Sequence, residues 1–175
     1  MKLYFSGDVQ ECWKGIEILS EELGYEPYKD IPESFSIENR YSDKRNNSSE
    51  AILKVEVKKK AGSDICVTKR GINVSIRYSQ KIHFFRALGL MLEEVGRNKA
   101  DFDITEHPQF TMNGAMFDVS QGNAVMKVET VKNFLRRMAV MGLNMLMLYC
   151  EDSYEVKTQP YFGYMRGKYS YEDMK

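Results

Sequence analysis

The chain has 175 residues, a length that suits one domain, or one domain and part of another. Its 25 Lys and Arg residues balance 25 Asp and Glu residues, so no net charge draws the whole chain to nucleic acid or to an anionic membrane. No stretch approaches the roughly 18 apolar residues of a membrane span, and the opening MKLYFSGDVQE is too polar for a secretory leader. We therefore expect a cytoplasmic protein without a membrane or nucleic-acid partner.

Residues 1–100 predict a small α+β domain. A strand is expected over 1–5, and a helix follows in which Asp8 and Glu11 have the spacing of a capping box. Gly24 is expected to end that helix, because glycine adopts the left-handed backbone that closes helices. Beyond it lies a loop-rich stretch with one short strand, expected over 34–39.

Residues 51–78 predict antiparallel strands. Apolar residues alternate with polar ones over 52–57, 65–68 and 72–78, and turn residues separate the three runs. An amphipathic helix is expected over 80–95. The fold expected for 1–100 is thus an antiparallel sheet with helices on one face, and 101–112 is expected to be a linker.

Residues 113–155 predict a strand, a helix and a second strand. Apolar residues recur at helical spacing after 128, and Gly142 is expected to end the helix. The run 144–150 is apolar at nearly every position, which is typical of a parallel strand buried on both faces. Glu151 and Asp152 follow this second strand, where parallel α/β folds place their chemistry. The alternative is a packing unit whose acids are simply solvated.

The segment 161–169 is rich in aromatic residues and carries two glycines. Such a loop offers surface on which a sugar could stack, or it is packed by its own aromatics. A parallel sheet of two strands is not viable alone, so we expect the chain to be part of a longer protein.

These residues resemble glycoside hydrolase family 20, the β-N-acetylhexosaminidases. The pattern Gly114-Ala-Met-Phe-Asp118-Val-Ser is similar to the first barrel strand of that family, and 142–149 with the acidic pair is similar to the second. The loops Glu151 to Glu155 and Pro160 to Gly167 resemble those of intracellular bacterial members. The resemblance implies that 113–175 is the N-terminal part of a truncated (β/α)8 TIM barrel, preceded by a small α+β domain.

The resemblance also implies an exo-acting hydrolase that removes terminal N-acetylglucosamine or N-acetylgalactosamine from a glycan. Configuration is retained because the 2-acetamido group of the substrate acts as the nucleophile. The catalytic Asp-Glu pair of the family follows the fourth barrel strand, so we name no catalytic residue and expect this chain alone to be inactive. No cofactor is implied, and the scattered histidines and cysteines suggest no metal site.

Four residues are expected to bind the sugar if the resemblance is carried over position by position. Glu151 stands where a family acid accepts hydrogen bonds from sugar hydroxyls, and Asp152 and Asp118 have supporting roles. Asn113 stands where the family has an arginine that grips the sugar, and Gln121 replaces a second arginine. Asparagine can still bind a hydroxyl, but it lacks the charged guanidinium fork.

As part of a barrel, the chain is expected to expose barrel surface around Leu135, Met138 and Leu146, and so to form homo-oligomers.

Two alternative functions are open. One is a non-catalytic carbohydrate-binding or interaction module, with Glu151 and Tyr154, Tyr161 and Tyr164 as a sugar platform. Another is a different parallel-sheet enzyme complete in 175 residues, which the lack of a phosphate loop or a Cys-His or Ser-His arrangement disfavours.

Overall fold

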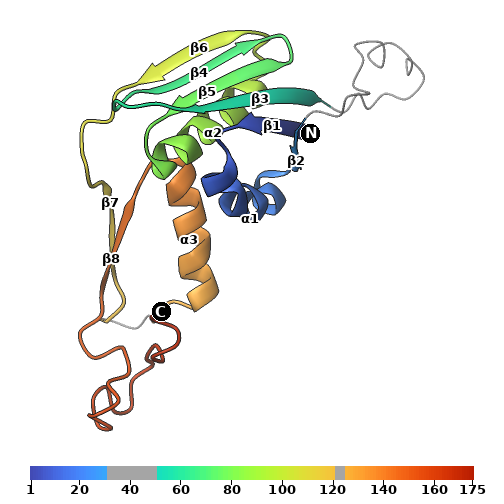
Figure 1. The fold of residues 1–175 in the computed structure, drawn as a ribbon. Coiled ribbons are helices and arrows are strands. Elements are labelled where there is room, and N and C mark those ends of the chain that lie inside the picture. The colour runs from blue at the N-terminus through green and yellow to red at the C-terminus, as the bar shows by residue number, and fades with distance from the viewer. Residues whose placement is uncertain (31–50, 121–124) are drawn as a thin grey trace. The chain divides into compact units, whose positions relative to one another are not determined.

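The computed structural model describes residues 1–30, 51–120 and 125–175, which divide into two compact units, Met1–Gln109 and Phe110–Lys175 (Figure 1). The strand expected over 34–39 and the position of Gln121 lie outside the described residues. Among the described helices, none has the length and apolar character that crossing a membrane requires.

The first unit is built on a six-stranded sheet in the order β2-β1-β3-β5-β4-β6. β1 runs parallel to both β2 and β3, and β3 runs parallel to β5, whereas β4 is antiparallel to β5 and β6. In chain order the elements are β1 (Lys2–Gly7), η1 (Gln10–Cys12), α1 (Trp13–Leu23), β2 (Glu26–Lys29), β3 (Ile52–Lys59), β4 (Ile65–Arg70), β5 (Asn73–Tyr78), α2 (Lys81–Gly96) and β6 (Phe102–Glu106).

The prediction of an antiparallel sheet is wrong for three of the five strand pairings in this sheet. The sequence predicts that β3 and β4 form a hairpin, but β3 pairs in parallel with β5, from Lys54 opposite Asn73 to Lys59 opposite Tyr78. An alternating pattern fixes which side of a strand is buried, and it carries no information on the direction of the neighbouring strand. The β4–β5 hairpin does form, and it turns at Gly71, whose φ is 55°.

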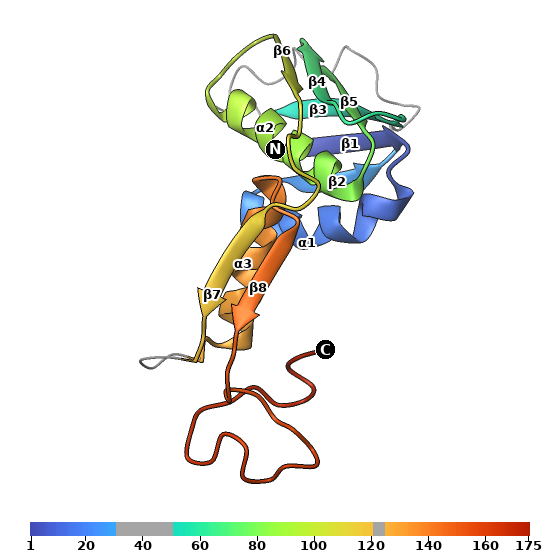
Figure 2. The ribbon, with the colours of Figure 1, turned by 90° about the vertical axis from the view of Figure 1, so that its left-hand side faces the viewer.

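Both helices of this unit lie on the same face of the sheet, as expected (Figures 1 and 2). Every second side chain of the central strands faces them and is fully buried, as are the inner stripes of the helices. Burying these apolar surfaces is the main stabilising contribution in the unit. The largest members of this core are Leu3, Phe5, Ile16, Val55, Val57, Val67, Ile76, Tyr78, Phe84, Leu88 and Met91.

The ends of α1 agree with the sequence only in part. Gly24 closes the helix with a φ of 71°, as expected. Asp8 does not cap it: no side-chain cap is formed at Val9 or Cys12, and Asp8 Oδ2 instead accepts a hydrogen bond of 2.8 Å from the backbone N–H of Lys59. The carboxylate therefore ties the end of β1 to the end of β3.

Two edge strands differ from the prediction. β6 occupies five residues of the stretch 101–112 expected to be a linker, and its Phe102 is buried against the core. β2 was not predicted, because its sequence Glu-Pro-Tyr-Lys contains a proline, which an edge strand tolerates where a central strand does not.

The second unit contains β7 (Gly114–Asp118), α3 (Val128–Val140) and β8 (Met145–Tyr149). The strands are parallel, in register from Gly114 opposite Met145 to Asp118 opposite Tyr149, so the predicted strand–helix–strand unit is present. Gly142 follows the helix with a φ of 82°.

The two strands are partly buried on one face and exposed on the other, which differs from the prediction for 144–150. Phe117 packs against Phe134 of α3, with ring centroids 5.0 Å apart, so one face of the strand pair meets the helix. On the other face Met116 and Met147, which are register partners, are 58% and 50% exposed. On the helix, Leu135 is exposed as expected, whereas Met138 is buried, contrary to the expectation.

Candidate functional site

The C-terminal ends of β7 and β8 lie side by side and carry three of the four predicted site residues. Asp118 is the register partner of Tyr149, and the backbone N–H of Val119 donates to Tyr149 O over 3.0 Å. Glu151 and Asp152 follow Tyr149 after one intervening residue, Cys150. The parallel pairing therefore brings Asp118 and the two later acids to the same edge.

Asp118 is held by hydrogen bonds to the residues that follow β7. Its Oδ1 accepts from the backbone N–H of Ser120 at 2.9 Å and from the Ser120 hydroxyl at 2.8 Å. Ser120 is itself buried. The carboxylate thus fixes the chain as it leaves the strand.

Glu151 points into solvent from a turn. Its backbone φ of 44° lies in the left-handed region, which non-glycine residues seldom adopt outside turns and functional sites. Its Oε1 accepts a hydrogen bond of 3.1 Å from the Tyr149 hydroxyl, and this bond, with the nearby negative charge, raises the pKa of Tyr149. An exposed carboxylate at a strand end is suited to accept hydrogen bonds from the hydroxyls of a ligand.

Asp152 faces Arg166, a residue that the sequence analysis did not single out. Arg166 Nη1 lies 3.3 Å from Asp152 Oδ1, an ion pair without hydrogen-bond geometry. Arg166 Nη2 donates to the backbone carbonyl of Ser120. The sequence offers Arg166 only as a member of the aromatic segment 161–169 and of the stretch Pro160 to Gly167 that resembles family 20, because a contact across 46 positions leaves no local pattern.

The loop after β8 is ordered around Ser153, which is completely buried. Its N–H and hydroxyl both donate to Cys150 O, at 2.8 and 2.7 Å, and its carbonyl accepts from Tyr169 N at 2.9 Å. Gly163 approaches Asp152 so closely that a Cβ would stand 2.2 Å from the Asp152 carbonyl oxygen. The segment 161–169 therefore lies directly against the turn that contains Glu151 and Asp152.

The aromatic residues of this loop divide into two groups. Tyr154 and Phe162 pack edge to face, with ring centroids 5.2 Å apart, which agrees with a loop packed by its own aromatics. Tyr161 and Tyr164 are 81% and 71% exposed, and their centroids are 6.3 Å apart. This second pair leaves aromatic surface available to a partner.

Asn113, the fourth predicted residue, lies at the opposite end of β7. Its backbone N–H donates to Asn144 Oδ1, and its carbonyl accepts from Asn144 N, both over 2.8 Å. A strand rises about 3.3 Å per residue, so the five residues to Asp118 separate the two by roughly 16 Å. The structure therefore does not bring Asn113 to the other three residues.

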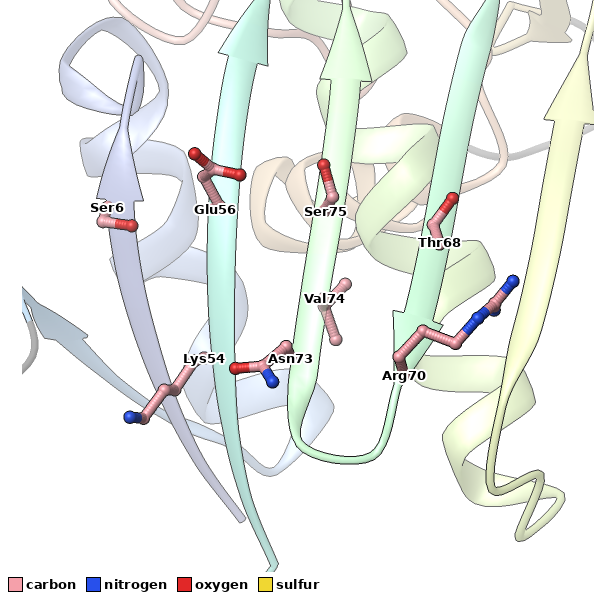
Figure 3. A pocket seen from close by; sticks show the side chains of 8 residues that line it. All are labelled: Ser6, Lys54, Glu56, Thr68, Arg70, Asn73, Val74 and Ser75. Carbon is pink, nitrogen blue, oxygen red and sulfur yellow. The ribbon is translucent and has the colours of Figure 1, made fainter. Parts of the chain in front are cut away.

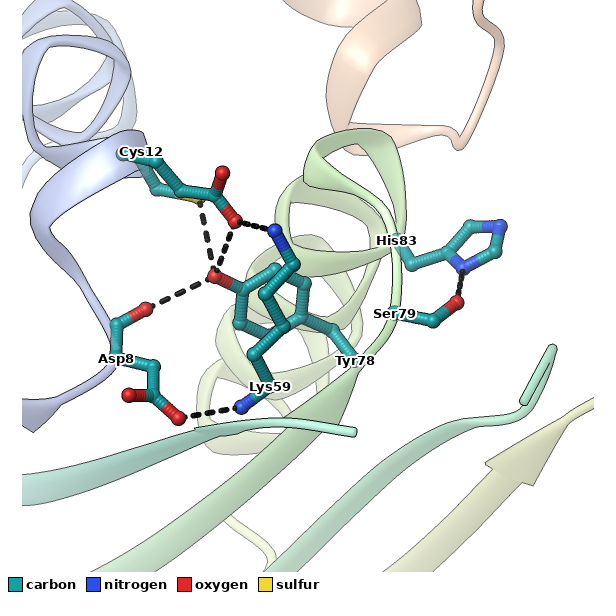
Figure 4. Close-up of polar contacts among 7 residues, drawn as sticks. Asp8, Cys12, Lys59, Tyr78, Ser79 and His83 are labelled. Atoms are coloured by element: carbon teal, nitrogen blue, oxygen red, sulfur yellow. Dashed lines mark hydrogen bonds and ion pairs between the residues drawn. The ribbon is translucent and has the colours of Figure 1, made fainter. Parts of the chain in front are cut away.

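The first unit has a polar network at the carboxyl ends of its parallel strands (Figure 4). The hydroxyl of Tyr78 donates toward Asp8 O at 2.9 Å and Glu11 Oε1 at 3.0 Å, and Lys59 Nζ lies 2.5 Å from the same Glu11 oxygen. These bonds lower the pKa of Glu11 and, with burial, raise that of Tyr78. All of these groups bind one another, so the network joins η1 to the sheet.

An open depression of about 470 Å³ lies on the face of the sheet away from the helices (Figure 3). A row of register partners crosses it, running Ser6, Glu56, Ser75 and Thr68 on four strands. Two of its charged groups form ion pairs within the protein: Glu56 with Lys58 at 2.8 Å, and Arg70 with Asp103. These are the features of a solvated sheet face. Across the described ranges, no cluster of three metal-ligating side chains is found.

Comparison with protein-family models gives no match, and comparison with the curated proteins gives none either. The fold is nevertheless similar to that of solved glycoside hydrolase family 20 structures. The β-N-acetylhexosaminidase of Streptomyces coelicolor A3(2) matches with a TM-score of 0.68 and 17% identity, over 99% of this chain and 38% of that one. The exo-β-N-acetylglucosaminidase of Vibrio harveyi matches with a TM-score of 0.67 and 15% identity, over 99% of this chain and 29% of that one.

A third similar structure is the Flavobacterium johnsoniae chitobiase, with a TM-score of 0.62 and 18% identity, over 99% of this chain and 28% of that one. The chain thus spans about a third of the length of these structures. The resemblance to family 20 is confirmed at the level of the fold: a mixed sheet with helices that corresponds to part of these enzymes.

Proposed function

We propose that this chain is the N-terminal part of an exo-acting β-N-acetylhexosaminidase of glycoside hydrolase family 20. The observation that carries the proposal is the similarity of fold along 99% of the chain to enzymes of that family. The complete enzyme hydrolyses terminal N-acetylglucosamine or N-acetylgalactosamine with substrate-assisted retention of configuration. The catalytic Asp-Glu pair belongs to a later part of the barrel, and the 175-residue chain by itself is inactive.

In this proposal β7, α3 and β8 are the first strand, helix and second strand of a (β/α)8 barrel, and the barrel begins near Phe110. The uncovered strand face, formed by Met116, Met147 and Tyr149, supports it. Parallel strands occur in proteins with both faces covered, and this face corresponds to the filled interior of a barrel. Without its neighbours, the face and the exposed Leu135 favour self-association of the chain.

Glu151 is the residue proposed to contact the hydroxyls of the terminal sugar. Its exposed carboxylate at the end of β8 supports this role, since α/β barrels carry their ligands at that end of the strands. Asp118 at the end of β7 and Asp152 after the end of β8 are proposed to have supporting roles beside Glu151. Asn113 is left out of the proposed site because it lies at the other end of its strand.

A carbohydrate-binding module without catalysis is a second candidate. The exposed faces of Tyr161 and Tyr164 favour it, because aromatic rings offer the apolar, amphipathic surface on which sugar rings stack. In this case sugar binding depends on the tyrosines as well as on Glu151.

The first experiment is to read the gene past the codon for Lys175 and to assay the complete product for release of p-nitrophenol from its N-acetylglucosaminide. An open frame with an Asp-Glu pair after a fourth strand pattern, and activity of the complete product, supports the enzyme. A stop codon directly after Lys175 overturns it and leaves the binding module.

The site itself is tested by adding N-acetylglucosamine to the 175-residue chain and observing the chemical shift changes by NMR. Glu151→Gln is expected to weaken the affinity for the sugar, measured from the sugar-induced chemical shift changes, about tenfold. The reason is the loss of a charge-assisted hydrogen bond. The matched control is Glu172→Gln, an exposed acid paired only locally with Lys175 at 3.0 Å, which is expected to leave the shifts unchanged. If Glu151→Gln binds the sugar as tightly as the control Glu172→Gln does, Glu151 is not part of the site.

A further inference from the structure

We propose that Arg166 is a positioning residue that holds the polar ends of β7 and β8 in one fixed arrangement. We call the contacts of Arg166 with Ser120 and Asp152 the clamp, which rests on the structure alone. The effect of the clamp on sugar binding rests on the function proposed above.

The first half of the clamp reaches the end of β7. Arg166 Nη2 donates to the carbonyl of Ser120, and the N–H and hydroxyl of Ser120 both donate to Asp118 Oδ1. Ser120 is buried, so its carbonyl has little access to water. The guanidinium therefore fixes the same residue that holds the Asp118 carboxylate.

The second half reaches the turn after β8. Asp152 Oδ1 is buried and has no hydrogen-bond partner within the described residues, and a buried carboxylate oxygen in that state is costly unless a charge compensates it. The Arg166 guanidinium, 3.3 Å away, supplies that charge. Asp152 and the end of β7 thus depend on the same side chain.

The backbone that carries Arg166 is seated on the same turn. The N–H of Arg166 donates to Gly163 O over 3.1 Å, and Gly163, with a φ of 65°, lies directly against the carbonyl of Asp152. The segment is therefore fixed by its backbone at Asp152 and by its guanidinium at both strand ends. Lysine cannot reproduce this, because a single ammonium lacks the planar fork that binds two groups in set directions.

The clamp has a consequence for recognition. Glu151, the carboxylate proposed to bind the sugar hydroxyls, must be held in a fixed position, because a small displacement of such a group costs much of the binding. Its supporting acids Asp118 and Asp152 lie at the ends of different strands, and Arg166 contacts the surroundings of both. Its removal is therefore expected to loosen the site without unfolding the strands.

The clamp is tested by amide hydrogen exchange of the 175-residue chain, observed by NMR at Ser120 and Ser153. Arg166→Met keeps the length of the stem and removes the guanidinium, and it is expected to speed exchange at Ser120 by about tenfold or more, as local opening does. Lys168→Met is the matched control: it removes a cation from the same loop whose Nζ contacts only Phe162 O, at 3.1 Å. Exchange in this control is expected to match that of the unmodified chain.

The positioning role is tested on the same samples with N-acetylglucosamine as the probe. Arg166→Met is expected to weaken the affinity for the sugar, measured from the chemical shift changes at Glu151, by about tenfold. Arg166→Lys is expected to keep part of the exchange protection but not the affinity. Unchanged exchange in Arg166→Met overturns the clamp, whatever the sugar does. Faster exchange with full sugar-induced shifts overturns the positioning role. Faster exchange in a chain that shows no shifts before mutation upholds the clamp and removes the proposed sugar site.

Discussion

Gly114 lies against the backbone of Met145 so closely that a Cβ at position 114 would stand 1.8 Å from the Met145 carbonyl oxygen. The two residues are register partners at the beginning of β7 and β8. Real Cβ atoms do not approach backbone atoms to this distance, so any side chain at position 114 must push the two strands apart.

Gly114→Ala is therefore expected to destabilise the second unit by about 1–3 kcal/mol, the usual cost of forcing a methyl group into filled space. The loss is measured by urea unfolding, with amide exchange at Val119, which bonds Tyr149 O, as a local reporter. Gly167→Ala is the control, since a Cβ there makes only an ordinary contact of 3.7 Å with Val125. Equal stability of the two variants would contradict the close approach of β7 and β8.

Tyr78→Phe is expected to destabilise the first unit by about 1–2 kcal/mol, because it removes the hydroxyl that donates in two part-buried hydrogen bonds. The Tyr78 hydroxyl binds Asp8 O and Glu11 Oε1 and lies in the core. Tyr28→Phe serves as the control, because the Tyr28 hydroxyl binds Glu26 on an exposed edge strand. Chemical denaturation of both variants decides the point, and a loss in Tyr28→Phe as large as that in Tyr78→Phe would argue against the buried network.

Burial lowers the pKa of His83 below its ordinary value of 6.5. The folded protein therefore binds fewer protons than the unfolded chain in the pH range just below 6.5, so stability is present above that value and falls as the pH falls through this range. His83→Gln, which can keep a bond to the Ser79 hydroxyl, is expected to make stability less dependent on pH there. Urea unfolding at about pH 7.5 and about pH 5.5 gives the comparison. An identical pH dependence in both proteins would rule out this effect of His83.

The Tyr149 hydroxyl donates to Glu151, which raises the pKa of Tyr149 above its ordinary value of 10.0. In Glu151→Gln the negative charge is gone, so Tyr149 is expected to ionise at lower pH than in the unmodified chain. The stability that this bond contributes is present below pH 10.0 and is lost as the pH rises toward the raised value. Titration of the Tyr149 ring by carbon NMR measures the change, with Glu172→Gln as control. A titration that does not move in Glu151→Gln would mean that the two groups are not in contact in solution.

The helices of this protein could be predicted from the sequence, because their signals are local. Apolar stripes and terminal glycines mark α1 and α3, and Gly24 and Gly142 close them in the left-handed conformation. The strand–helix–strand order of the second unit also follows from the sequence, and it placed Asp118 and Glu151 at one edge.

The arrangement of strands in the first unit could not be predicted in the same way. β3 alternates equally well in a parallel or an antiparallel pair, and its place between β1 and β5 depends on pairing with a strand about fifty residues earlier in the chain. β6, with the sequence FDITE, has two charged residues among its five and so lacks the apolar run of a buried strand.

Two features of the candidate site were beyond sequence reasoning for related reasons. Arg166 acts through contacts with Ser120 and Asp152 that depend on how the loop returns to the strand ends. Asn113 looked like part of the site because a motif aligned it there, but the length of β7 separates it from Asp118.

The strand order of the first unit also constrains how the protein can fold as it is synthesised. β1, made first, has an early parallel partner in β2, but its second partner β3 emerges only about fifty residues after it, and β3 in turn waits for β5. Since β5 and β4 form a local hairpin, that hairpin is the natural starting point, and the N-terminal strand is added to it afterwards. During translation, apolar surface of β1 and α1 therefore stays exposed until β3 and β5 have left the ribosome.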